Sequence, residues 1–104
     1  MRGEVSDVSY IFWKVNLLLS TISRINDILE KMENNETLDS EEEKYLKNAP
    51  NILKSIKYSI EDINSRLSTL QDPFLRNYFG ELLTKVKVRT EEIEEKVKRL
   101  LQTD

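Results

Sequence analysis

The most basic point of the chain is the group Lys85, Lys87 and Arg89, whose side chains could bind a phosphate or another anion. On a helix these three side chains point in different directions, with Lys87 turned away from the other two. Lys54 and Lys57 are further cations that could contribute. A nucleic-acid or anionic-ligand binding protein is therefore one hypothesis. Nucleic-acid binding needs a basic face, however, and a chain with a net charge of −3 argues against it.

Acidic side chains gather in residues 33–48, a segment with six acidic and two basic residues. Within it, Glu41, Glu42 and Glu43 could offer oxygen ligands to calcium or magnesium. Consecutive helical residues point in different directions, and the segment lacks the glycine-bearing loop of an EF-hand. Favourable electrostatics at the start of a helix explain the acidic residues better. We predict neither a metal site nor another cofactor.

The sequence has no cysteine and no histidine, which excludes several kinds of chemistry. The protein can form no disulfides, carry out no thiol redox reactions and build no zinc site of the Cys/His kind. Nucleophilic catalysis by cysteine or by a serine–histidine pair is excluded as well. Asp, Glu, Lys and Tyr could still serve in acid–base catalysis, but no two carboxylates fall on an apolar stripe where burial would shift their pKa values. We predict that the protein is not an enzyme, and an enzyme with a carboxylate site is the weakest hypothesis.

The chain of 104 residues is long enough for one domain, residues 1–104, and its composition favours helices. Two glycines and two prolines are too few for the many turns of an all-β protein. The apolar periodicity predicts helices at about residues 7–33, 40–48, 50–71 and 73–102. In the first of these, apolar residues recur at alternating steps of three and four from Val8 to Met32, a pattern typical of helical bundles.

Capping residues and prolines set the expected helix boundaries. Asp7, or Ser6 before it, would accept the free amide hydrogens at the start of the first helix. Asp39 with Glu42, or Ser40 with Glu43, has the spacing of a capping box ahead of the short second helix. Pro50 and Pro73 would each stand in the first turn of the helix that follows. In the last helix the predicted apolar stripe includes Leu75, Phe79, Leu82 and Val86 and shifts near Arg89 and Thr90. Gly80 would permit a close approach of a neighbouring helix or a kink.

The predicted fold class is all-α, an antiparallel up-down-up helical bundle of three long helices plus one short helix. Tight turns near Asn35 and Asp72 would place the starts of the first and last helices at the same end. Two groups of aromatic residues would meet there, namely Tyr10, Phe12 and Trp13 with Phe74, Tyr78 and Phe79.

The first helix has a second apolar face opposite its main stripe, formed by Tyr10, Trp13 and Leu17. A helix that is apolar all round is one that is covered all round, and three helices can cover only one face. The cover is the short second helix, a partner subunit or a target. We predict a homodimer that contacts itself through these three residues, because a two-fold contact is the commonest way to close such a face. Another protein or peptide, or internal packing, is the alternative.

These features predict a non-enzymatic structural or protein–protein interaction module that self-associates through the first helix. No apolar stretch approaches the roughly 20 residues of a membrane span, so none is expected. The apolar stretch 11–19 is interrupted by Lys14 and Asn16 and precedes no cleavage site, so we predict no signal peptide and expect a cytoplasmic location. Enrichment in Lys and Glu favours a heat-adapted host, whereas eight asparagines argue against one.

Overall fold

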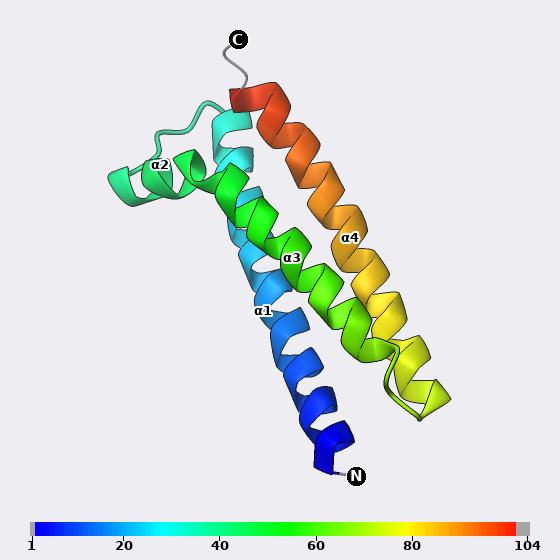
Figure 1. Ribbon diagram of the computed structural model, residues 1–104. Helices are drawn as coiled ribbons and strands as arrows, with labels where there is room; N and C mark the ends of the chain where they lie inside the picture. The colour runs from blue at the N-terminus through cyan, green and yellow to red at the C-terminus, as the bar shows by residue number, and fades with distance from the viewer. Residues whose placement is uncertain (1, 102–104) are drawn as a thin grey trace.

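The computed structural model describes residues 2–101, with side chains from residue 6 onward. All regular structure in this part of the chain is helical, which confirms the predicted all-α class with three long helices and one short one. The helices are α1 (Arg2–Glu33), α2 (Ser40–Lys47), α3 (Ala49–Leu67) and α4 (Pro73–Leu101), shown in Figure 1.

The three long helices form an elongated body that measures 50 × 21 × 20 Å. α1 and α4 run in the same direction and α3 runs in the opposite one, while α2 projects sideways near the end of α1 (Figure 1). α4 packs closely against both α1 and α3, which contact each other less. The side of the molecule between α1 and α3 is therefore the more open one. None of the helices in residues 2–101 is long and apolar enough to cross a membrane.

The start of α1 differs from the prediction, because the helix begins at Arg2 and continues through Ser6 and Asp7. Asp7 therefore does not cap it. Its carboxylate instead accepts a hydrogen bond from Nη1 of Arg66 on α3, at 3.1 Å. An aspartate near the start of an apolar pattern can serve as a cap or as half of an ion pair between helices, and the sequence alone does not separate the two roles.

The other boundaries differ by smaller amounts. α3 ends at Leu67, four residues before the predicted end. The hydroxyls of Ser68 and Thr69 donate to the carbonyl oxygens of Ser65 and Arg66, both at 2.7 Å, and this bonding to the local backbone competes with helix continuation. α4 extends to Leu101, and the predicted end at residue 102 lies outside the described residues.

The turn after α1 closes at Asn35, near the position predicted. Asn35 has φ of 59°, a left-handed conformation that asparagine adopts more readily than most residues. The amide of Glu36 then donates to the carbonyl oxygen of Lys31 at 2.8 Å, the bond expected of a Schellman motif. The chain reverses within a few residues and leads directly to α2.

The start of α2 carries the predicted capping box. The Glu42 amide donates to Oδ1 of Asp39 at 2.8 Å, and the Asp39 amide donates to Oε1 of Glu42 at 3.0 Å. Glu42 is buried, and its Oε2 also accepts from Nζ of Lys31 on α1 at 2.6 Å. The hydrogen bond from Lys31, followed by the one from the Asp39 amide, lowers the pKa of Glu42. The acidic residues at this position thus stabilise a helix start and its attachment to α1.

The core is a single cluster of aliphatic residues and one aromatic residue. In α1 the buried residues follow the predicted stripe from Ile11 to Leu29, with Ile28 buried in addition, while Val8 and Met32 at its ends are only partly buried. In α4 the stripe differs from the prediction, because Leu83 is buried and Leu82 is only partly so. Thr90 is also buried, and its hydroxyl donates to the carbonyl oxygen of Val86 at 2.7 Å. This bond satisfies the polar atom within the core.

Candidate functional site

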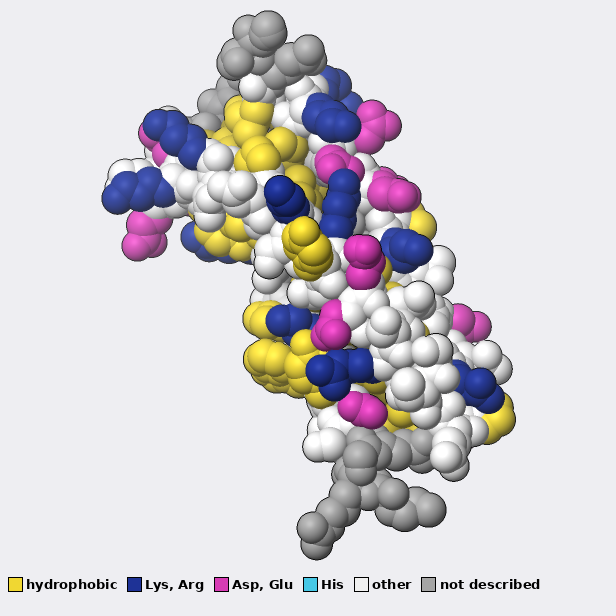
Figure 2. Space-filling view, viewed as in Figure 1, with side chains coloured by type: hydrophobic (Ala, Val, Ile, Leu, Met, Phe, Trp, Pro, Cys, Tyr) yellow, Lys and Arg dark blue, Asp and Glu magenta, His cyan; other side chains and the backbone are white. Residues whose placement is uncertain are grey.

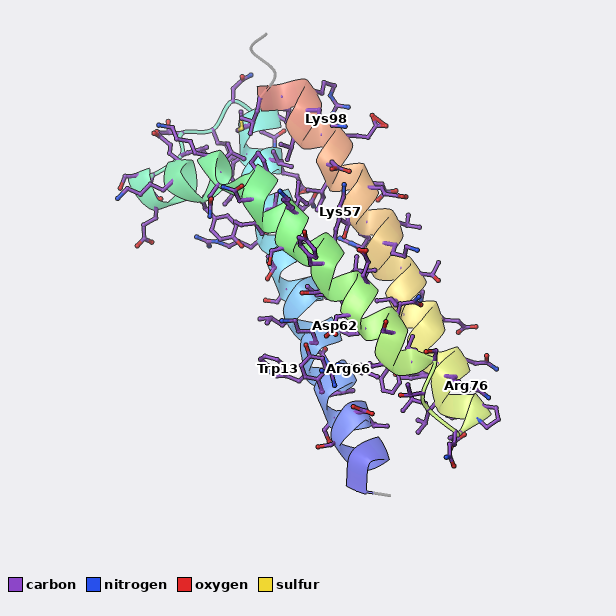
Figure 3. All side chains as sticks on the ribbon, viewed as in Figure 1. Trp13, Lys57, Asp62, Arg66, Arg76 and Lys98 are labelled. Carbon is purple, nitrogen blue, oxygen red and sulfur yellow. The ribbon has the colours of Figure 1, made fainter. Side chains whose placement is uncertain are left out.

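The outer face of α1 is uncovered in the first half of the helix. Trp13 keeps 57% of its surface exposed and Leu17 keeps 43%. Trp13 projects away from the helical body (Figure 3), and apolar side chains gather on the same flank of the molecule (Figure 2). Nζ of Lys14 lies 5.4 Å from the centre of the Trp13 ring. Of the predicted self-association residues, these two are the exposed ones.

Tyr10, the third predicted self-association residue, faces α3. Its hydroxyl donates to Oδ2 of Asp62 at 3.0 Å, and the guanidinium of Arg66 lies 4.1 Å from the centre of its ring. Nε of Arg66 also donates to Asp62, at 3.3 Å (Figure 3). The hydrogen bond to the Asp62 carboxylate raises the pKa of Tyr10, because it favours the neutral phenol. Tyr10 thus anchors α1 to α3 while its ring stays 6.1 Å from that of Trp13.

A second group of exposed aromatic residues lies at the start of α4. The rings of Phe74 and Tyr78 are stacked, with centres 6.4 Å apart and planes inclined by 6°. Tyr78 also packs edge-on against the buried Phe79 at 5.4 Å. Phe74 is 72% exposed and Tyr78 is 47% exposed. The sequence predicts that these rings meet those of the first helix, but it does not predict their exposure.

Phe12 brings the two aromatic groups together, in part as predicted. It is 57% exposed and borders a groove of about 130 Å³ between α1 and α4. None of the described side chains that line this groove is charged. They are Phe12, Val15, Asn16 and Leu19 from α1 and Tyr78, Phe79 and Leu82 from α4. The structure therefore brings Phe12 to the aromatic residues of α4, while Tyr10 turns to α3 and Trp13 turns outward.

We call this set of surface residues the apolar belt. It includes five of the seven large hydrophobic residues that are exposed in the described part of the chain, together with the half-buried Tyr10. Its members are Tyr10, Phe12, Trp13, Leu17, Phe74 and Tyr78.

The basic residues Lys85, Lys87 and Arg89 are exposed, but the fold does not join them into one site. Arg89 borders a groove of about 380 Å³ that Glu92 and Glu95 also line. Lys87 borders a different groove, of about 330 Å³, that Glu61 and Glu91 line. Arg89 and Lys87 therefore border different grooves, each with two carboxylates, and Lys85 lines neither of these grooves.

The remaining candidate charges have partners or lie apart. Nζ of Lys57 pairs with Oε2 of Glu94 at 2.6 Å, which ties α3 to α4, while Lys54 is exposed on α3. Within the described part of the chain, no group of three or more acidic residues is placed to hold a metal ion. The carboxylate of Glu42, the most buried of the acidic patch, is already bonded to Lys31.

Comparison with protein-family models, with curated proteins and with solved structures finds no match to this chain.

Proposed function

We propose that the protein is a non-enzymatic structural or protein–protein interaction module whose up-down-up bundles form a homodimer through the outer face of α1. The observation behind this proposal is the exposure of Trp13 and Leu17 on a helix whose opposite face is fully buried. Exposed apolar residues scattered singly are ordinary on a protein surface, whereas a contiguous group indicates an interaction site. Here the centres of the Trp13 and Tyr10 rings are 6.1 Å apart, so these exposed residues form a contiguous group.

The Arg66 guanidinium beside this face is already paired, which supports an apolar contact. Arg66 bonds to Asp7 and Asp62, and it covers one side of the Tyr10 ring. The pair with Asp7 joins α1 to α3, and Asp62 on α3 accepts the hydrogen bond of the Tyr10 hydroxyl. A partner therefore meets a fixed apolar surface and does not need to rearrange it, which lowers the entropic cost of association.

The proposal is tested by the mass of the protein in solution, measured by light scattering. The native chain should have twice its chain mass of 12.3 kDa. Trp13→Glu should have the mass of one chain and keep the helical circular dichroism of the native protein, because a charge cannot be buried in an apolar contact without a large desolvation cost. A native protein that stays monomeric at about 100 μM, a concentration that populates even weak dimers, would contradict the proposal.

Tyr58→Glu is the matched control. Tyr58 is 69% exposed and lies on α3, outside the apolar belt. The substitution introduces the same charge on an equally accessible helix surface. It should leave the mass of the dimer unchanged, and loss of the dimer in this variant would place the contact on another surface.

A further inference from the structure

The apolar belt has one part on the α3 side of α1 and one part on the α4 side. Tyr10 and Trp13 are neighbouring rings on the α3 side, Phe12 and Tyr78 border one groove on the α4 side, and the small polar residues of the outer face lie between the two parts. Tyr78 in turn stacks on Phe74. A partner that covered only Tyr10, Trp13 and Leu17 would leave the α4 side of the belt exposed.

The size of the belt matches half of a dimer interface. If a complete aromatic side chain has about 200 Å² of surface, the exposed fractions of Phe12, Trp13, Leu17, Phe74 and Tyr78 leave about 500 Å² uncovered. A stable interface buries about 800 Å² on each partner, of which roughly 60% is apolar. The belt therefore supplies the apolar part of one half of a standard interface, and a second copy supplies an equal half.

The centre of the outer face of α1 has residues suited to close helix pairing. Ser9, Trp13, Asn16 and Ser20 follow at steps of four, three and four, opposite the buried stripe, and all four are exposed. The two serines are small enough to let a second helix approach. An antiparallel helix centred on this stretch places Ser9 opposite Ser20 of the second copy and Trp13 opposite Asn16 of the second copy.

The position of α2 favours the antiparallel direction. α2 projects sideways where α1 ends (Figure 1), and its Tyr45 lies 5.4 Å below the guanidinium of Arg24 on α1. The outer face of α1 is thus polar and partly covered from Arg24 onward. Two α1 helices that overlap antiparallel, centred between residues 14 and 15, place Arg24 of each copy opposite residue 5, so α2 lies beside the first turn of the other helix, whereas a parallel pair would place the two α2 helices against each other.

We infer that two copies of this chain pair their α1 helices antiparallel about a two-fold axis near residues 14 and 15, and that the interface extends to α4. Phe12 of each copy then lies over the groove between Asn16, Leu19 and Tyr78 of the other copy. Phe74 and Tyr78 of α4 then form the edge of the interface. This inference rests on the proposed self-association and adds its direction and its α4 edge.

Cysteine cross-linking tests the direction of pairing, because the chain has no cysteine of its own. The variants are Ser9→Cys, Ser20→Cys and the double variant. Within one helix the two positions are about 16 Å apart, too far for a disulfide. The double variant should therefore form disulfide-linked dimers on mild oxidation, and each single variant should stay unlinked. Linked dimers of Ser9→Cys alone would indicate parallel pairing and overturn the inference.

Tyr78→Glu tests the α4 edge, with Tyr58→Glu as its matched control. Tyr78→Glu should weaken self-association at least about tenfold, the effect of a partly desolvated charge, and Tyr58→Glu should not change it. Circular dichroism verifies that both variants are helical, and if Tyr78→Glu unfolds, the cross-linking result decides. This inference would be overturned if Tyr78→Glu left the dimer intact and the double cysteine variant formed no linked dimer. If Trp13→Glu still dissociated the native dimer, the proposed function would stand. A monomeric native protein would contradict both.

Discussion

At the scale of single residues, stability depends on aliphatic side chains that are completely enclosed. Ile22 lies in the middle of α1 with none of its surface exposed. Ile22→Ala should lower the free energy of unfolding by about 2–5 kcal/mol, since it removes buried methyl groups and leaves a cavity. Urea unfolding at one protein concentration measures the change. The neighbouring exposed Ser23→Ala is the control, and an equal effect of both substitutions would contradict the placement of Ile22 in the core.

The buried carboxylate of Glu42 makes stability depend on pH. Its pKa is lower in the folded protein than in the unfolded chain, because Lys31 donates a hydrogen bond to it and the Asp39 amide donates another. The stabilisation is complete above the ordinary pKa of glutamate, about 4.3, and is lost as the pH falls through the lower folded-state value. The melting temperature of the native protein should therefore fall more steeply on acidification than that of Glu42→Gln. Parallel curves for the two proteins would contradict the assignment.

Sequence periodicity predicts the buried residues well where one stripe faces one surface. Ile11, Ile22 and Leu29 follow the predicted pattern of α1 and are completely buried. The prediction is wrong at Leu82, which is only partly buried, while Leu83 is buried instead. The reason is that α4 packs against two helices, so its buried face is wider than one stripe. The role of Asp7 in an ion pair depends on Arg66, 59 residues away. Such a long-range partner has no local sequence pattern.

At the scale of helices, Gly80 is a weak point in α4. It does not adopt a positive φ, and a Cβ added there would meet no other helix within 4 Å, so no close approach of a neighbouring helix requires glycine at this position. Gly80→Ala should raise the free energy of unfolding by about 0.5–1 kcal/mol, because alanine loses less backbone freedom in a helix than glycine. Urea unfolding provides the measurement. A destabilised variant would mean that a neighbouring group occupies the space beside Gly80.

Helix boundaries are predictable where the determinants are local. The capping box of α2 and the turn at Asn35 depend on residues within a few positions of each other, and the sequence indicates both. The early start of α1 and the early end of α3 depend on which of several hydrogen bonds the side chains make. The hydroxyls of Ser68 and Thr69 donate to nearby backbone carbonyl oxygens, and the amino-acid sequence alone does not indicate that they select these acceptors.

At the scale of the whole molecule, the two ends of the bundle are chemically different. The end formed by the starts of α1 and α4 bears the apolar belt. At the other end charged residues join the helices, where Arg99 pairs with Glu33 at 3.3 Å and Lys31 pairs with Glu42. The sequence predicts the Trp13 face because it lies on one helix. It also predicts that Phe12 meets the aromatic residues of the last helix, but it does not predict that Phe12, Phe74 and Tyr78 stay exposed, which depends on how two helices are placed side by side.

The fluorescence of Trp13 tests the central claim most directly, because it is the only tryptophan in the chain and lies in the middle of the face concerned. If a second copy covers that face, the emission should be blue-shifted and resistant to iodide at about 100 μM and should become that of an exposed indole on dilution below the dissociation constant. An emission spectrum and a quenching constant that stay typical of exposed tryptophan over the whole concentration range would contradict the account.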